Sequence, residues 1–466
     1  MATDDEYPTP ARSSAGPGPS LPPGAVGASS ALTVQAPDED EPGVDDRVDL
    51  AATTVPPELV VNSLGEYLRA WGKRIRNGES GVLPILAGLV VIVVIFQSQN
   101  SKFLSAGNLV NLFVQAAVFV LLGLAEIFVL LLSEIDLSTG FTLAVGAFVI
   151  AELVATPNNW PWWAGIAGGL VVTAAIGALH GTLITRLHLP SFVVTLAGLL
   201  GWEGVMLWLA NVDKTAVGGV IRIAANSPIV KLVNSNMSSL LSWGLLAVLV
   251  LLFAAVTIPR AARRRARGLS APPVSITLLT VVLTALAGVA LVAICEVNRG
   301  ALVPLRGVPW VVPFVLAVVI MWSFLLARTR LGRYISAIGA NPEAARRAGI
   351  NVARIRIIAF TLCSLTAGIA GLVYESRFGS MATDVDGGTL VLYAVAAAVI
   401  GGTSLFGGRG KPVHALLGGV VIAAVYNGLG LLGIGTAGQD MATALVLLAA
   451  VTVDSLVRRR GSARTA

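Results

Sequence analysis

The chain has 466 residues and a net charge of +6; 55% of its residues are hydrophobic and only 12% are charged. Soluble domains carry about 25% charged residues, so a soluble protein of this length is excluded because too little polar surface remains to cover it. Two isolated cysteines and three scattered histidines give neither a disulfide framework nor a metal-ligand spacing. We expect an all-α integral membrane protein with no metal site and no nucleic-acid partner.

The N-terminal segment, 1–58, is predicted to be a disordered acidic cytoplasmic tail. It holds eleven acidic and two basic residues, is rich in Pro, Gly and Ser, and shows no apolar periodicity, so it cannot bury enough apolar surface to fold. A regulatory tail and a dispensable extension are both compatible with this composition. The segment 59–80 then becomes basic and amphipathic, which predicts an interfacial helix on the cytoplasmic side of a membrane.

Twelve apolar stretches follow, and most approach the roughly 20 residues that a spanning helix needs. They lie at 82–97, 109–132, 138–155, 162–185, 191–209, 240–258, 275–295, 308–327, 357–374, 390–402, 413–435 and 439–454. If both termini are cytoplasmic, nearly every Arg cluster falls in a cytoplasmic loop, including the basic tail at 457–466, as the positive-inside rule requires. We therefore predict a polytopic transmembrane helical bundle of about 12 spans over 81–456. The stretch at 390–402 is marginal, so a broken or re-entrant segment is an alternative there.

The loop at 328–356 is the most informative segment between the predicted spans. It carries seven Arg and one acidic residue, Glu343. Asn341 is a suitable N-cap, Pro342 suits the first helical turn, and Gly349 can end the helix. This pattern predicts a cytoplasmic helix of about two turns, a shape that can dock into a groove of a partner protein. A solvated positive-inside loop is the simpler alternative, but it does not account for the capping residues.

Acidic residues in or next to the predicted membrane spans are a second feature of interest. Burying a charge in lipid is costly, so such residues often have a function or an ion-pair partner. Glu134 and Asp136 lie between the second and third predicted spans. Asp136 can cap the N-terminus of the third span. Alternatively, both carboxylates can line a pathway and bind the hydroxyl groups of a sugar.

Four segments carry a joint resemblance to a known family. They are EIDLSTG at 134–140, LPSFVVTLAGLLGWEGV at 189–205, LGRYISAIGANPEAARRAGINVARIR at 331–356 and IGGTSLFGGRGK at 400–411. In this order they resemble the ribose, arabinose, galactose and xylose permeases of ABC importers, a branched-chain-type permease family, and the third contains an EAA-x-x-x-G loop. Glu134 and the basic turn between the sixth and seventh spans are similar to the xylose-type branch, which implies a ten-span core with an extra hairpin.

The resemblance implies a function and a set of partners. Two copies of the permease would form a homodimer, separate cytoplasmic ABC ATPase subunits holding ATP and Mg²⁺ would grip the short helix, and an extracytoplasmic binding protein would deliver the sugar. The substrate would be a monosaccharide, in particular a pentose such as xylose. The protein would lie in the plasma membrane of a prokaryote. This chain would hold no cofactor and is not expected to be an enzyme, because its nearest P-loop candidate at 407–411 lacks the required spacing.

Three groups of residues receive roles, the ATPase contact and the signature loop from this resemblance, and the translocation path from polar side chains in or beside the predicted spans. Contact with the ATPase is assigned to Asn341, Pro342, Glu343, Ala344, Ala345, Arg346 and Gly349. The translocation path is assigned to Glu134, Asp136, Ser138, Thr195, Trp202 and Asn427. The signature loop consists of Gly401, Gly402, Thr403, Ser404, Gly407 and Gly408. Val391 and Tyr393 replace acids found in ribose-type relatives, so no role is expected for acids at that point of the chain.

Two other functions are compatible with a polytopic membrane protein. An ion-coupled secondary sugar transporter predicts internal inverted repeats and a midplane cation site, but no clear repeat is visible in the sequence. A membrane-embedded enzyme needs clustered His or Asp, or a nucleophile beside a base, and the sequence shows no such cluster. The ATP-driven permease is the interpretation that gives the 328–356 loop a purpose.

Overall fold

The computed structural model describes residues 83–212, 218–269, 271–300 and 304–445, together with 448 and 452. All of them belong to the unit Pro56–Ala466. The expected acidic tail at 1–58, the interfacial helix at 59–80 and the basic tail at 457–466 lie outside the described residues and stay predictions.

Eight of the described helices are long and apolar enough to cross a membrane. They are α3 (Ala106–Leu130), α5 (Trp162–Arg186), α6 (Ser191–Val212), α8 (Ser239–Ala266), α9 (Val274–Glu296), α10 (Val311–Arg328), α13 (Val352–Phe378) and α15 (Pro412–Leu431). Three shorter apolar helices are α2 (Leu83–Gln99), α4 (Thr139–Val154) and α14 (Gly387–Ile400). Each coincides with a predicted stretch, so the helical membrane architecture is confirmed. The twelfth stretch is helical over 436–445, and the count of about 12 spans stays a prediction.

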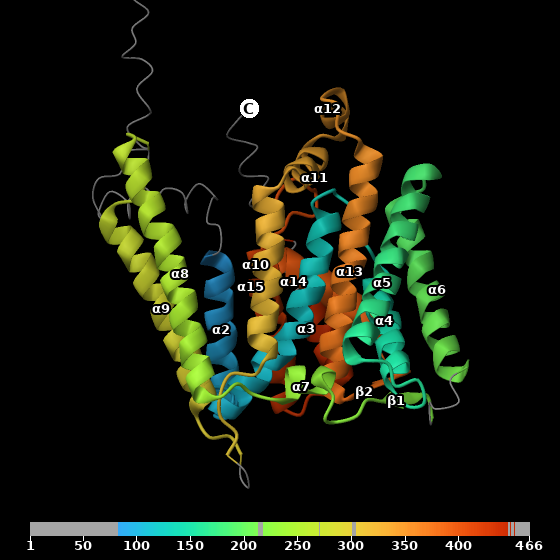
Figure 1. Ribbon diagram of the computed structural model, residues 1–466, viewed down its shortest axis with the longest axis horizontal. Helices are drawn as coiled ribbons and strands as arrows, with labels where there is room; N and C mark the ends of the chain where they lie inside the picture. Colours follow the sequence, from blue (N-terminus) through green and yellow to red (C-terminus); the bar gives the residue numbers. More distant parts are fainter. Residues whose placement is uncertain are drawn as a thin grey trace, which may run out of the picture. The chain divides into compact units, whose positions relative to one another are not determined.

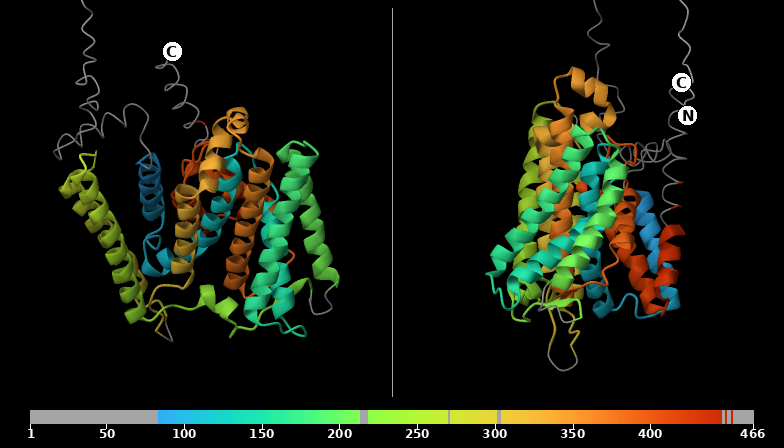
Figure 2. Two further views of the ribbon diagram at one scale, coloured as in Figure 1. Left: turned by 45° about the horizontal axis from the view of Figure 1, so that its top comes forward. Right: turned by 90° about the vertical axis from the view of Figure 1, so that its right-hand side faces the viewer.

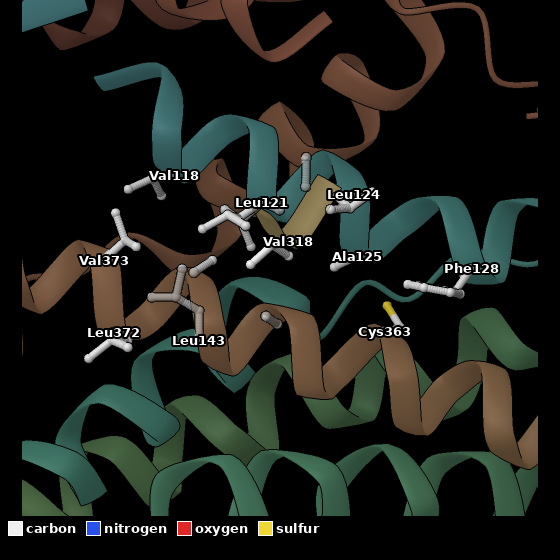
Figure 3. Close-up of a cluster of buried hydrophobic side chains, with 14 of the residues drawn as sticks. Val118, Leu121, Leu124, Ala125, Phe128, Leu143, Val318, Cys363, Leu372 and Val373 are labelled. Carbon is white, nitrogen blue, oxygen red and sulfur yellow. The ribbon is translucent and has the colours of Figure 1, made fainter. Parts of the chain in front are cut away.

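Helix α3 runs through the middle of the bundle, with α13, α14 and α15 packed around it (Figure 1). In its most apolar window 89% of the residues are buried, against 6% in α8 and 11% in α9. Helices α8 and α9 pack against each other at the edge of the bundle (Figure 1), where their exposed apolar side chains suit contact with lipid. That this hairpin is an addition to a ten-span core stays a prediction. Figure 3 shows Leu121 and Phe128 of α3 within the core, together with Leu143 of α4 and Val373 of α13.

Glycines bring the central helices into close contact. A Cβ atom on Gly418 of α15 would lie 1.8 Å from the carbonyl oxygen of Ala397 in α14. A Cβ atom on Gly419 would lie 2.6 Å from Cγ2 of Val120 in α3. Small residues at such positions allow helix backbones to approach within a membrane, so α15 is packed tightly against both α14 and α3.

The two ends of the bundle differ. One end carries α11 (Arg330–Ala340) and α12 (Pro342–Arg347), and the opposite end carries α7 (Pro228–Asn234) and two strands (Figures 1 and 2). The strands β1 (Val220–Arg222) and β2 (Ser380–Ala382) pair antiparallel with Ile221 opposite Met381, a small departure from the all-α prediction. We name the α12 end the inner end and the strand end the outer end, which is the orientation that the positive-inside rule predicts.

Candidate functional site

The short helix expected within the 328–356 loop is present as α12, and its N-terminus is capped. Oδ1 of Asn341 accepts a hydrogen bond from the backbone N–H of Ala344 at 2.9 Å, and Pro342 occupies the first turn. Gly349 follows with φ +81°, a conformation that favours glycine. The helix stands at the inner end of the bundle, beyond the ends of the long helices (Figure 1).

The surface of α12 is charged and open to a partner. The Glu343 side chain is 55% exposed and lies 3.4 Å from both Arg346 and Arg347, which are 70% and 81% exposed. Of the α12 side chains, Ala345 is the buried one. Exposed ion pairs of this kind contribute little to stability, so the charges on α12 are not needed to hold the helix in place.

Directly behind α12, three segments meet in a contact layer formed by the end of α11, the end of α3 and the signature loop. A Cβ atom on Gly339 of α11 would lie 1.7 Å from the carbonyl oxygen of Leu131 and 2.7 Å from the backbone N of Gly408. The N–H of Gly408 donates to the Leu131 carbonyl at 3.0 Å, and the hydroxyl of Ser133 donates to the carbonyl of Phe406 at 2.8 Å.

The signature loop is a tight turn that closes this layer. Gly401 is the C-cap of α14, and Gly402, Gly407 and Gly408 have φ of +102°, +79° and +71°. The side chains of Thr403 and Ser404 are buried. Glycine is the residue that adopts positive φ without strain, so this stretch of glycines serves the compact turn.

Glu134 connects the contact layer to α13. Its carboxylate forms an ion pair with Arg356, which lies in the second turn of α13. Burial raises the pKa of Glu134 to about 7, while the Arg356 guanidinium acts in the opposite direction. Helix α13 follows α12 directly in the chain. The ion pair therefore links the α3–α4 connection to the first turns of α13, close to α12.

Asp136 and Ser138 take part in a buried hydrogen-bond chain rather than in a pocket. Oδ1 of Asp136 accepts hydrogen bonds from the N–H of Ser138 at 3.0 Å and from its hydroxyl at 2.6 Å. That hydroxyl lies 3.3 Å from Nδ1 of His180, whose Nε2 accepts a hydrogen bond from the indole N–H of Trp202 at 3.0 Å. Asp136 and Ser138 are fully buried. The N-cap residue of α4 is Ser138 and not Asp136, so both roles considered for Asp136, capping and pathway lining, stay predictions.

Three further hydrogen bonds involve residues of the predicted translocation path or their neighbours. The hydroxyl of Thr195 lies 3.4 Å from the carbonyl oxygen of Ile135, and the hydroxyl of Thr139 donates to Glu126 at 2.9 Å. Asn427 lies apart on α15, where its Oδ1 accepts a hydrogen bond from Asn108 at 2.8 Å. Five of the six predicted path residues therefore gather around the α3–α4 connection, and Asn427 is separate.

A cavity of about 260 Å³ lies toward the outer end, between α3, α13, α14, α15 and the helix at 436–445. Its lining includes polar side chains from three of these elements and from the connection before α14, namely Gln115, Arg377, Asp384, Asp386, Gln439 and Asp440. Its aromatic lining includes Phe119, Tyr393 and Tyr426. None of the six predicted path residues lines this cavity, so sequence reasoning missed it.

Contacts between side chains fix the aromatic wall of the cavity. The rings of Phe119 and Tyr393 lie 5.4 Å apart between centroids at 86°, and Phe119 and Tyr426 lie 5.8 Å apart at 64°. The Tyr393 hydroxyl donates a hydrogen bond to Asp440 at 3.0 Å. Edge-to-face packing of this type orients aromatic rings, so Tyr393 presents a defined surface. An acid thus accompanies Tyr393 after all, but it is supplied by another helix.

The comparisons with known proteins can be placed on this geometry. The family model described as the permease component of branched-chain amino acid transport systems matches residues 108–453. The chain belongs to this family. It is a multi-pass transport permease subunit, and the match covers the contact layer, the buried cluster and the lining of the outer cavity.

Several curated relatives of this permease cover most of both chains. The xylose transport system permease protein XylH of Escherichia coli (strain K12) is 32% identical over 380 residues, which is 81% of this chain and 93% of the relative. From the same organism, the D-allose transport system permease protein AlsC is 30% identical over 372 residues, 80% and 90% of the two chains. The ribose import permease protein RbsC is 30% identical over 370 residues, 79% and 92%. No solved structure matches this permease.

The permease connects its two candidate sites through two helices. Helix α13 has 27 residues, about 40 Å at a rise of about 1.5 Å per residue. It reaches from Arg356, whose ion pair with Glu134 connects it to the contact layer, to the cavity at Arg377. Helix α14 begins beside the cavity, where Asp386 caps it by accepting the N–H of Thr389 at 2.9 Å, and ends in the signature loop at Gly401. The inner and outer sites thus lie at opposite ends of the same two helices.

Proposed function

We propose that this permease is the membrane-spanning subunit of an ATP-driven importer for a monosaccharide, in particular a pentose such as xylose. The observation that carries the proposal is α12, a capped helix with exposed charges at the inner end. It packs against α11, whose Gly339 belongs to the contact layer with α3 and the signature loop. A surface helix that nothing in the described chain covers suits docking into a groove of a partner.

The relatives support the class of substrate. The three relatives named above transport xylose, allose or ribose according to their names, and all three compounds are monosaccharides. The family model is named for branched-chain amino acids. The three relatives are individual proteins that match about 80% of the chain, so their names are the more specific guide to the substrate.

The partners follow from this function. Separate ABC ATPase chains would hold ATP and Mg²⁺ and receive α12 through Asn341, Pro342, Glu343, Ala344, Ala345, Arg346 and Gly349. A second permease copy would complete the pore, and an extracytoplasmic binding protein would deliver the sugar to the outer end. Both termini of the chain would be cytoplasmic, in the plasma membrane of a prokaryote.

The contacts of α12 provide a route for coupling. Movement of the ATPase would displace α12 and α11, whose Gly339 is in close backbone contact with Leu131 and Gly408. The displacement would pass to α3 and α14 through this layer, and to α13 through the chain itself and the Glu134–Arg356 ion pair. Packed helices shift as rigid elements rather than deform, and access would alternate as they move between two arrangements.

An ion-coupled secondary sugar transporter is the alternative function. It requires a midplane cation site and leaves α12 without a partner. Uptake experiments separate the two functions, because a secondary transporter moves sugar without ATP.

The test reconstitutes the permease in liposomes with its candidate ATPase and a sugar-loaded binding protein. Uptake of labelled D-xylose is measured with ATP on the ATPase side for the natural chain, for Glu343→Arg and for the control Arg267→Glu. Arg267 is an exposed residue at the inner end of the α8–α9 hairpin, so its charge reversal leaves α12 untouched. We expect ATP-dependent uptake that Glu343→Arg abolishes and Arg267→Glu retains. If uptake depends neither on ATP nor on Glu343, the ATP-driven importer is wrong and the protein is a secondary transporter.

A further inference from the structure

The charges around the outer cavity select against an anionic ligand. Three carboxylates line it, those of Asp384, Asp386 and Asp440, against one guanidinium, that of Arg377. The guanidinium carbon lies 5.8 Å from the ring centroid of Phe378, a cation–π distance. A carboxylate ligand would meet three like charges at short range, where repulsion is strong, so a neutral ligand fits better than an amino acid.

Two amide side chains in the cavity wall have unused acceptors. Gln115 of α3 and Gln439 of the helix at 436–445 are each 8% exposed. Neither Oε1 atom has a hydrogen-bond partner within the described part of the chain, and Nε2 of Gln439 donates to the carbonyl of Ile434 at 2.9 Å. A buried acceptor without a donor costs free energy. Both residues line the cavity, so rotation of each buried amide group would present its oxygen to the hydroxyl groups of a ligand, which would supply the missing donors.

The remaining wall suits the other face of a sugar ring. A pyranose has hydroxyl groups around its rim and C–H groups on its faces, so it needs acceptors together with an apolar surface. The rings of Phe119, Tyr393 and Tyr426 provide that surface, and Asp440 holds the Tyr393 hydroxyl at 3.0 Å. At about 260 Å³ the cavity is smaller than the roughly 300–1,000 Å³ of pockets for drug-sized ligands, which matches a small ligand.

We propose that this cavity binds a neutral monosaccharide during import, with the amide oxygens of Gln115 and Gln439 accepting hydrogen bonds from its hydroxyl groups. The Tyr393–Asp440 pair faces the same space and determines which pattern of hydroxyl groups fits. The proposal rests on the proposed function for the class of ligand. It adds a binding site within the permease itself, separate from the binding protein.

Cysteine labelling tests the site without relying on transport. The natural cysteines Cys295 and Cys363 are fully buried, so they should not compete for a thiol reagent, and a thiol at Gln439 would be reached through the cavity that this residue lines. We would place Gln439→Cys in the full-length chain, assembled with its ATPase in liposomes, and label it from outside with a charged, membrane-impermeant maleimide. Lys102→Cys is the matched control, because Lys102 is exposed between α2 and α3 and does not line the cavity.

D-Xylose is expected to slow the labelling of Gln439→Cys in a saturable way, about threefold at twice its Kd, because about one third of the sites then remain free. Labelling of Lys102→Cys should not change, and L-leucine should slow neither. A second substitution, Gln115→Leu in the Gln439→Cys background, should raise the protecting xylose concentration about fivefold, since one hydrogen bond is lost.

Parallel uptake measurements keep the two proposals distinct. If the natural complex imports xylose but xylose, ribose and allose all leave labelling unchanged, the cavity proposal is wrong and the importer stands. If sugar protects but ATP drives no uptake, the cavity proposal stands and the importer fails. Equal protection by leucine, or no labelling of Gln439→Cys at all, would overturn the cavity as a sugar site open to the outer side.

Discussion

Removing the cap of α12 should weaken coupling to the ATPase while the bundle stays folded. The Asn341 side chain accepts the N–H of Ala344 at 2.9 Å, and Asn→Ala at an N-cap costs about 1 kcal/mol. Helix α12 has six residues, and isolated helices below about 12–15 residues are marginal in water. With Ala345 as its one buried side chain, little packing offsets the loss of the cap.

The expected magnitude follows from population arithmetic. A cost of about 1 kcal/mol lowers the ratio of formed to unformed α12 about fivefold, and the apparent affinity for the ATPase falls by up to the same factor. Asn341→Gly should lose only a few tenths of a kcal/mol. The affinity for the ATPase should therefore be highest for the natural chain, lower for Asn341→Gly and lowest for Asn341→Ala. The assay titrates ATPase against permease in liposomes and records the half-maximal concentration for xylose uptake.

The chain supplies a matched control in Asn351. It caps α13 with the same geometry, accepting the N–H of Arg354 at 2.9 Å, but α13 has 27 residues and packs along α3, α4 and α5. Asn351→Ala should therefore cost a similar free energy without unwinding its helix, and ATPase affinity should stay near the natural value. An Asn341→Ala chain with unchanged ATPase affinity, or an equal loss in Asn351→Ala, would refute this reasoning.

Three further substitutions probe the packing and the cavity. Gly418→Ala would place a Cβ atom 1.8 Å from the Ala397 carbonyl oxygen, and such overpacking costs about 1–3 kcal/mol or more. Its thermal midpoint in detergent should fall, while Gly430→Ala, with nothing within 4 Å, should hold or gain up to about 1 kcal/mol. Tyr393→Phe removes the hydroxyl that donates to Asp440, so half-saturation for xylose should rise about fivefold with unchanged ATPase affinity. Equal midpoints for the two glycine variants, or unaltered xylose saturation in Tyr393→Phe, would contradict these expectations.

The spans and the short inner helix could be read from the sequence because each depends on neighbours in the chain. An apolar stretch of sufficient length specifies a membrane helix through its own backbone hydrogen bonds, and Asn341 lies three residues from the N–H that it accepts. The 14 residues of α14 give only about 21 Å, short of the roughly 30 Å hydrocarbon core, as the marginal stretch at 390–402 indicated.

The outer cavity could not be read in the same way. Its lining comes from elements separated by up to about three hundred positions, from Gln115 on α3 to Asp440 beyond α15. None of these residues forms a motif with its sequence neighbours, and Tyr393 alone gave no reason to expect an acid beside it. The surroundings of Asp136 could not be predicted for a related reason, because the hydrogen-bond chain that begins at Asp136 and Ser138 continues to His180 and Trp202 on α5 and α6.

The arrangement of the central helices implies that the inner and outer sites influence each other. The cavity walls on α13 and α14 continue to the contact layer, and Gln115 lies on α3, whose last turn meets that layer at Leu131. Gln439 lies on a different element, the helix at 436–445. A shift imposed at α12 therefore changes the separation between the walls that carry the two free acceptors, and a sugar held by both resists that shift. Because coupling between binding sites is reciprocal, the xylose concentration that protects Gln439→Cys should differ between the permease with its ATPase and the permease alone.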